Sequence, residues 1–162
     1  MIISRTPVRV SFCGGGTDLP AYYMDSENGG LVTSMALAKH IHVTVNKRFD
    51  SSVRVSYSKT EIVNDFEELE HELVREAMRI TGVTQSVEIT TIADIPSRGT
   101  GLGSSSALTV GLLNALHTFA GRNPDAAQLA DEACQIEIDI LGQPIGRQDQ
   151  YAAAFGGSNQ IA

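Results

Sequence analysis

The sequence predicts an α+β fold in a single domain, and three observations support this prediction. The first third of the chain is rich in short segments of alternating apolar residues, which favour strands. The last third carries longer apolar stretches with the spacing of helices. The chain has 162 residues, of which 42% are hydrophobic and 19% charged, enough to bury one core. Strands and helices segregated along the chain are typical of α+β domains.

Alternation of apolar and polar residues predicts the strands. Val43 and Val45 alternate with Thr44 and Asn46, as expected when one face of a strand is buried. Pro7 indicates an edge or an irregular start for the first strand, because proline donates no backbone hydrogen bond. We therefore predict strands over residues 2–12, 31–38, 40–49, 53–57 and 87–92, with a short turn between the second and the third.

Apolar residues at intervals of three or four predict the helices. Leu69 and Leu73 begin such a stripe, and Gly82 is placed to end its helix. The segment 108–120 is apolar on almost every side, which places that helix in the core. The run Asn123–Asp125 offers an N-cap, a proline at the first helical position and an acid in the first turn. We therefore predict helices over residues 67–80, 108–120, 123–141 and, as a short apolar turn or helix, 151–155.

Composition restricts the partners and the surroundings of the chain. The formal net charge of −7 argues against nucleic acid and against an anionic membrane surface. No apolar run is long enough to span a bilayer. Cys13 and Cys134 form neither a disulfide framework nor a metal motif, so we expect a cytoplasmic protein. Residues 155–162 resemble a turn leading into a new strand. We therefore expect residues 1–162 to be one truncated domain whose C-terminal half is missing.

The Gly- and Ser-rich segment Ile95–Ala107 joins a predicted strand to a predicted helix. Its glycines allow the backbone to approach a ligand closely, and the free N–H groups of a helix start favour an anion, typically phosphate. Ser104–Ser106 add hydroxyl donors and a magnesium ligand. The alternative is an ordinary loop with a serine N-cap, and the segment alone does not decide. It matches neither a Walker A loop nor the Rossmann fingerprint.

Three carboxylates stand out, and each has two interpretations. Asp18 follows the glycines Gly14–Gly16 and is either a solvated loop residue or a group that binds hydroxyls. Glu137 borders the apolar stripe of its helix and is partly buried, so it is either a salt-bridged structural acid or a metal ligand. Asp149 lies in the polar loop 142–150 and is either a hydrogen-bonded loop acid or a positioned base.

Taken together, these features resemble the GHMP kinases, the superfamily of galacto-, homoserine, mevalonate and phosphomevalonate kinases. Pro96–Ala107 is similar to the phosphate-binding motif of that family, and Arg9–Asp18 is similar to its first motif. Glu137 and the loop 142–149 resemble the segment with the magnesium-binding glutamate and the catalytic aspartate. Gly15 and Gly16 stand where galactokinases have Glu-His, which argues against a galactokinase. The heptose 7-phosphate kinase branch is the most similar, through Ser4–Pro7, Phe12–Pro20, Arg98–Ser106 and Gly146–Tyr151.

The resemblance implies a two-layer sandwich, in which a mixed, largely antiparallel sheet carries helices on one face. It also implies an ATP-dependent kinase that phosphorylates the anomeric hydroxyl of D-glycero-D-manno-heptose 7-phosphate, with ATP and Mg²⁺ as cofactors. The alternatives are a fucose- or galactose-type anomeric sugar kinase and a catalytically silent regulator that binds sugar and nucleotide. The implied partners are a sugar phosphate and ATP, with no nucleic acid and no membrane; a homodimer is the assembly to test.

The resemblance finally implies a role for each site residue. Asp149 would orient or deprotonate the acceptor hydroxyl, and Arg9 would neutralise charge beside it. Ser105 and Glu137 would hold the magnesium ion. The nucleotide phosphates would lie against Gly101, Leu102, Gly103, Ser104, Ser105 and Ser106, and the sugar against Asp18, Thr17 and Gly16. A 7-phosphate needs a further cation, for which the candidates are Arg5, Arg98 and Arg147.

Overall fold

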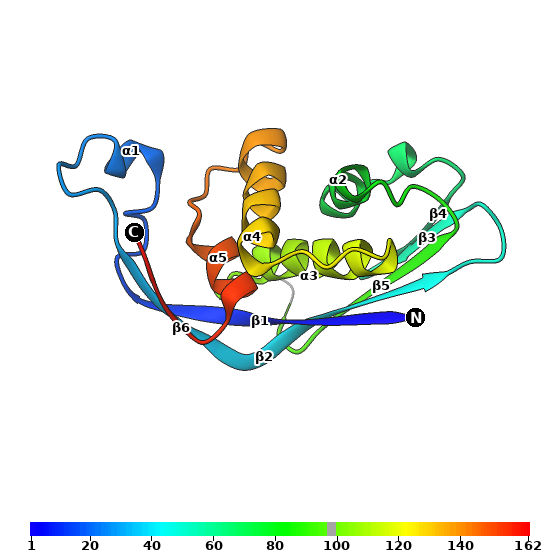
Figure 1. Cartoon of the computed structure of the whole chain (residues 1–162), viewed down its shortest axis with the longest axis horizontal. Coiled ribbons are helices and arrows are strands. Elements are labelled where there is room, and N and C mark those ends of the chain that lie inside the picture. Colours follow the sequence, from blue (N-terminus) through cyan, green and yellow to red (C-terminus); the bar gives the residue numbers. More distant parts are fainter. Residues whose placement is uncertain (97–99) are drawn as a thin grey trace.

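The computed structural model describes residues 1–96 and 100–162. They form a sheet with helices packed on one face (Figure 1). Two layers therefore enclose the core, as the α+β prediction requires. The strands of the described residues are β1 (Ile2–Cys13), β2 (Val32–Lys47), β3 (Val53–Ser56), β4 (Thr60–Val63), β5 (Val87–Ala93) and β6 (Ser158–Ile161). The helices are α1 (Pro20–Tyr23), α2 (Glu72–Thr81), α3 (Ser104–Phe119), α4 (Ala126–Cys134) and α5 (Gln148–Phe155), with a 3₁₀ turn at Phe66–Glu68 and a π-helical segment at Gln135–Ile140.

The sheet is organised around the long strand β2. Its order is β1-β2-β5-β3-β4, and β6 also pairs with β2. Strand β1 runs antiparallel along one edge of β2, while β6 and β5 share the other edge, at residues 32–35 and 41–47 respectively. Only the β3–β5 pair among the described strands is parallel, so the sheet is mixed and largely antiparallel, as predicted.

The predicted turn between residues 31–38 and 40–49 is wrong, because β2 is continuous through both segments. The alternation changes phase within the strand: Val32 and Ser34 are buried near its start, and Ile41 and Val43 are buried further along. The register with β1 shifts between Pro7 and Arg9. This irregularity in the ladder lets β2 change its buried face without a turn, although the sequence suggested a turn at that point. The sequence also gave no signal for β4, a short half-exposed strand that forms a hairpin with β3.

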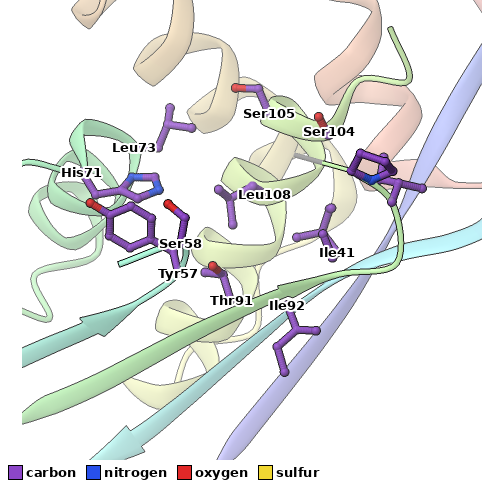
Figure 2. Close-up of a pocket in the computed structure, with 13 residues that line it drawn as sticks. Ile41, Tyr57, Ser58, His71, Leu73, Thr91, Ile92, Ser104, Ser105 and Leu108 are labelled. Atoms are coloured by element: carbon purple, nitrogen blue, oxygen red, sulfur yellow. The ribbon is translucent and has the colours of Figure 1, made fainter. Parts of the chain in front are cut away.

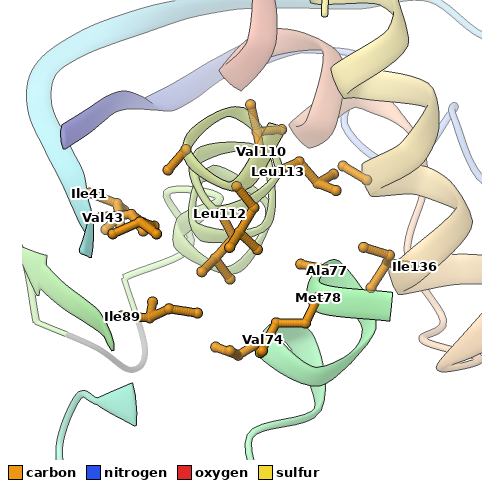
Figure 3. Packing of buried hydrophobic residues seen from close by; sticks show 14 of the residues in the cluster. Ile41, Val43, Val74, Ala77, Met78, Ile89, Val110, Leu112, Leu113 and Ile136 are labelled. Carbon is orange, nitrogen blue, oxygen red and sulfur yellow. The ribbon is translucent and has the colours of Figure 1, made fainter. Parts of the chain in front are cut away.

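Helix α3 forms the centre of the core, as its apolar sequence predicts. Leu112, Leu113 and Leu116 are completely buried, and α3 packs on β1 and β2 below and on α2, α4 and α5 around it (Figure 3). The helix begins at Ser104, earlier than the predicted residue 108, so the serines belong to its first turn. None of the helices in the described part of the chain combines the length and apolar character needed to cross a bilayer.

Two other helices, α2 and α4, begin later than predicted. The predicted helix 67–80 begins only at Glu72, because Asp65 caps a separate 3₁₀ turn and Leu69 is extended; its end at Gly82, in the left-handed conformation, is as predicted. The helix predicted from Asn123 begins at Ala126, where the Asp125 carboxylate accepts a hydrogen bond from the Gln128 N–H at 2.8 Å.

Helix α4 continues through the π-helical segment to Leu141, close to the predicted end. The wider π turn carries Ile136 and Glu137, and both are fully buried. Helix α5 begins at Gln148, three residues before the predicted 151, so Asp149 lies in its first turn. The new strand expected at the end of the chain is present as β6.

The corrected cap of α4 can be tested by substitution. Asp125→Ala removes the side-chain acceptor for the Gln128 N–H, and we expect the free energy of unfolding to fall by about 1 kcal/mol. Asn123→Ala, the matched control, removes the residue that the sequence had suggested as the cap, and we expect less than half of that loss. Urea denaturation followed by circular dichroism measures both. A larger loss for the Asn123 variant would contradict the observed helix start.

Candidate functional site

Four segments that are distant in the sequence meet at the N-terminal end of α3. They are the second half of β1 with the loop that follows it, residues 100–103 with the first turn of α3, the π-helical segment, and residues 147–149 at the start of α5. These are the segments that contain the predicted site residues of the described chain. Arg98 lies outside the described residues.

Arg9 and Asp149 form the central ion pair of this site. The Arg9 Nε and Nη2 atoms lie 2.7 and 2.6 Å from Oδ1 of Asp149. The Nη1 atom donates to the Gly101 carbonyl at 2.6 Å, and the Arg9 N–H donates to the Leu102 carbonyl at 3.1 Å. Arg9 therefore fixes the segment that precedes α3 against Asp149 on α5. The pairing joins two of the residues that the sequence selected.

Two opposing effects set the protonation of Asp149. Burial is the larger and raises the pKa of the carboxyl above its ordinary value, and the negative charge of Asp18 raises it further. The guanidinium of Arg9 acts in the opposite direction, by charge and by hydrogen bonding, without cancelling the effect of burial. Asp149 is thus a partly desolvated carboxylate whose affinity for a proton is enhanced, which is a property expected of a general base.

The backbone before α3 comes close to Asp149 because residue 103 is a glycine. Gly103 has a φ of 69°, in the left-handed region, and a Cβ there would lie 3.2 Å from Oδ2 of Asp149. The N-cap residue of α3 is this glycine, which has no side chain to accept a hydrogen bond from the N–H groups of the first turn. A helix terminus of this kind offers oriented donors and the positive end of the helix dipole to an anion.

Glu137 lies behind the serines of α3 and is fully buried. Its carboxylate accepts hydrogen bonds from Ser105 Oγ at 3.0 Å, Ser106 Oγ at 2.7 Å and Thr109 Oγ1 at 3.0 Å, and from the Gln150 side-chain amide. Among the described residues, no arginine, lysine or histidine pairs with it. Of the two interpretations of Glu137, the salt-bridged acid finds no partner among the described residues, and neutral donors surround its buried carboxylate.

Asp18 joins the loop after β1 to the start of α5. Its Oδ2 accepts from the Gln148 N–H at 3.0 Å, and its Oδ1 accepts from the Gly16 N–H at 3.2 Å. The Thr17 hydroxyl donates to the Gly14 carbonyl and accepts from the Leu31 N–H, so it holds the loop in place. The sequence indicated this loop but did not foresee that Thr17 is tied to the segment at Leu31.

A cavity of about 550 Å³ opens beside the first turn of α3. Leu73, Thr91 and Leu108 supply apolar and hydroxyl groups to its wall, and Ser104 and Ser105 line it at the helix start (Figure 2). Two rings of the lining, Tyr57 and His71, meet edge to face with their centroids 4.6 Å apart. Burial lowers the pKa of His71 below its usual value. Sequence reasoning missed these two residues, because they lie at a strand end and a helix start and belong to no motif.

A second cavity, of about 390 Å³, lies on the side of Asp18. Its lining includes Asp18, Tyr23, Gly29, Gly30 and Arg147. Together, the two cavities flank the N-terminus of α3 and three carboxylates, of which Glu137 is buried and Asp18 and Asp149 are half-buried. This arrangement can bind a polyanion and a polar ligand on neighbouring sides of one carboxylate base.

Comparison with known proteins agrees with the sequence motifs. The family model described as the GHMP kinases N-terminal domain matches residues 58–157. The D-glycero-alpha-D-manno-heptose 7-phosphate kinase of Campylobacter jejuni is 35% identical over 98% of this chain and 49% of its own length. The L-fucokinase/L-fucose-1-P guanylyltransferase of Bacteroides fragilis is 27% identical over 97% of this chain and 20% of its own. The chain thus spans half or less of the length of these two relatives.

Solved structures of the same type share the fold. The crystal structure of a D-glycero-D-manno-heptose 1-phosphate kinase from Bacteroides thetaiotaomicron is 28% identical and superimposes with a TM-score of 0.89. The match covers 99% of this chain and 55% of that one. The Methanococcus jannaschii mevalonate kinase, at 18% identity, has a TM-score of 0.78 over 98% of this chain and 52% of its own, which is a likeness of fold.

Proposed function

The chain belongs to the GHMP kinases, and from this premise we propose that it is the nucleotide-binding part of an ATP-dependent kinase acting on a sugar. The substrate that we propose is D-glycero-D-manno-heptose 7-phosphate, phosphorylated at its anomeric hydroxyl. The observation that carries the proposal is the juxtaposition of the Arg9–Asp149 pair with the uncapped start of α3. A kinase needs a phosphate cradle and a hydroxyl-activating group side by side, because phosphoryl transfer depends mainly on positioning and charge stabilisation.

The nucleotide side of the site is the start of α3. The phosphates of ATP would lie against Gly101–Ser106, where two glycines have left-handed backbone and the first turn of α3 begins without a side-chain cap from Gly103. The 550 Å³ cavity adjoins Ser104 and Ser105 and offers the Tyr57 and His71 rings together with Leu73 and Leu108. An apolar cavity with a few polar groups suits the base and ribose of the nucleotide.

The residues behind the phosphates suit magnesium, which prefers oxygen ligands and the oxygens of a bound nucleotide. Ser105 is exposed to the cavity, and its hydroxyl contacts the buried Glu137 carboxylate at 3.0 Å. The Oε1 atom of Gln150 is buried beside this group without a hydrogen-bond partner among the described residues. Ser105 and Glu137 would therefore hold the ion. When bound, it would neutralise charge on the phosphates.

Asp149 is the group that would activate the acceptor. Its Oδ1 is engaged by Arg9, and its Oδ2 faces the backbone at Gly103. In this position the carboxylate can accept the proton of a sugar hydroxyl while Arg9 balances its charge. Asp18 lies close enough to raise the pKa of Asp149, so it would orient neighbouring hydroxyls of the same sugar. Gly16, which donates to Asp18, would support that contact, and the Thr17 hydroxyl keeps the loop in shape.

The pH dependence of the reaction should report the environment of Asp149. Burial raises the pKa of this carboxyl, and only its deprotonated form is a base. We therefore expect the acid limb of kcat/KM to lie above the pH at which an ordinary aspartate ionises. Because Arg9 lowers the pKa, Arg9→Gln should move the acid limb to still higher pH and reduce kcat. A pH–rate profile of both proteins measures this. If the acid limb of Arg9→Gln lay at the same pH as that of the unaltered protein, Arg9 would not be setting the pKa of Asp149.

The substrate is tested by a comparison of sugars. We expect the complete natural polypeptide that contains these residues to consume ATP with heptose 7-phosphate and to show much lower kcat/KM with free heptose, L-fucose and D-galactose. A preference for fucose would favour the second candidate, which the similarity to an L-fucokinase supports. Binding of sugar and ATP without turnover of any acceptor would point to a silent regulator and overturn the kinase proposal.

A further inference from the structure

Arg147 is the residue directly before α5. It lines the 390 Å³ cavity on the Asp18 side of the site. The side chain is exposed, and among the described residues it forms neither an ion pair nor a hydrogen bond. By contrast, all three guanidinium nitrogens of Arg9 contact either Asp149 or the Gly101 carbonyl. Of these two described arginines, Arg147 is the one whose whole guanidinium is available to a ligand.

The position of Arg147 is fixed by its two neighbours in the chain. Gly146 packs so tightly on Asp18 that a Cβ at residue 146 would lie 1.9 Å from Asp18 Oδ2. On the other side, the Gln148 N–H donates to the same carboxylate oxygen at 3.0 Å. Ser11 Oγ, 2.6 Å from Gln148 Oε1, holds the Gln148 side chain in turn. The backbone of Arg147 is thus attached to Asp18 on both sides, and a residue between two such contacts keeps its place beside the sugar-facing carboxylate.

The other candidates for a phosphate-binding cation do not share this position. Arg5 lies on β1 between the buried residues Ser4 and Thr6, so it points to the face of the sheet away from the helices. Its register partner on β2 is His42. Arg98 lies outside the described residues. The structure therefore distinguishes two arginines that the sequence leaves equivalent.

We propose that Arg147 binds the phosphate that the acceptor sugar already carries and thereby selects a sugar monophosphate over the free sugar. The inference rests on the proposed function. A guanidinium presents a planar fork of donors that matches a phosphate, whereas the Asp18 carboxylate in the same cavity accepts hydrogen bonds from sugar hydroxyls. The phosphate is remote from the anomeric hydroxyl, and Arg147 lines a cavity whose described lining includes Asp18 but not Asp149. A cavity of about 390 Å³ is large enough for a sugar phosphate.

The test compares Arg147→Gln with the unaltered complete polypeptide on two acceptors, heptose 7-phosphate and heptose. We expect the KM and the calorimetric Kd for heptose 7-phosphate to rise roughly 10- to 100-fold in the variant, since hydrogen bonds between charged groups are lost. The kcat for heptose 7-phosphate, and the KM and Kd for free heptose, should stay within about two-fold of the unaltered values. Arg147→Lys keeps the charge without the planar fork, so its KM and Kd for heptose 7-phosphate should fall between those of the unaltered protein and Arg147→Gln. Arg5→Gln is the matched control and should change neither the KM nor the Kd for heptose 7-phosphate.

Three results would overturn the assignment. One is an unchanged constant for heptose 7-phosphate in Arg147→Gln. Another is an equal loss for both sugars, which would indicate a structural role. The third is an unaltered protein that binds the phosphorylated and free sugars equally, or binds neither. The calorimetric measurement separates this proposal from the kinase proposal. If the protein bound heptose 7-phosphate more tightly than heptose in a way that depended on Arg147, but turned over neither sugar, the role of Arg147 would be supported and the proposed kinase activity would be overturned.

Discussion

Replacement of Asp149 by asparagine should lower kcat by about 10²- to 10⁴-fold, the range that a positioned general base contributes. Asparagine has nearly the shape of aspartate and keeps an oxygen for Arg9, but it does not accept the proton of an acceptor hydroxyl at neutral pH. The proposed ATP site lies against the start of α3, and asparagine keeps an acceptor for Arg9, which holds Gly101 in place, so we expect the Kd for ATP to stay within a few-fold. Steady-state kinetics and calorimetric ATP titration of the complete polypeptide measure the two quantities.

The control for this variant is Asp139→Asn, which changes an exposed aspartate of the π-helical segment. It should leave kcat unchanged. If Asp149→Asn turned over acceptor at near the normal rate, the assignment of the base would be wrong. A parallel loss of ATP affinity would instead mean that the Arg9–Asp149 pair mainly holds the loop before α3, since Arg9 also binds the Gly101 carbonyl.

The second large effect is expected at Glu137. Glu137→Gln keeps the volume of the side chain but removes the negative charge. We expect the magnesium concentration for half-maximal activity to rise by at least about 10- to 100-fold, with a lower kcat at saturation. The fold should survive, because serine and threonine hydroxyls can turn to accept as well as donate. Gln150 can also turn its amide, whose Oε1 has no partner among the described residues, toward the new donor.

Glu132→Gln is the matched control for that experiment, because Glu132 lies on α4 and pairs with His117 at 2.7 Å, away from the serines. It should keep both the magnesium requirement and kcat. Magnesium titrations of the three proteins at saturating ATP provide the comparison. An unchanged requirement in Glu137→Gln would show that the buried carboxylate only organises the hydroxyls of α3.

The sequence predicted the fold class, the core helix and the strand that leads to it, because these depend on local periodicity. It failed where tertiary contacts decide. An irregular ladder opposite Pro7 and Arg9 replaced the turn expected within β2. At α4, the backbone geometry of Asp125 rather than the composition of Asn123–Asp125 set the helix start. A carboxylate at residue 137 was predicted to be partly buried, but its neutral donors come from residues 28 to 32 positions earlier in the chain, and from Gln150.

The site shows the same division. Glycine and serine spacing indicated the segment before α3, and the three selected carboxylates do lie around it. No local pattern indicated Tyr57 and His71, which line the cavity because α2 packs on α3 and β3 pairs with β5. The choice among the arginines was likewise inaccessible from the sequence, because it depends on which face of β1 carries Arg5 and on how Gly146 and Gln148 hold Asp18.

The product of the reaction tests the proposed kinase activity, and the role of Asp149 in it, most directly. Phosphorus NMR of the complete polypeptide, incubated with ATP, magnesium and heptose 7-phosphate, should show ADP and a new phosphomonoester coupled to the anomeric proton, in equal amounts. The same incubation with Asp149→Asn should show neither above background. ADP without a new sugar phosphate, or a phosphate on another hydroxyl, would contradict the account of how this site is built.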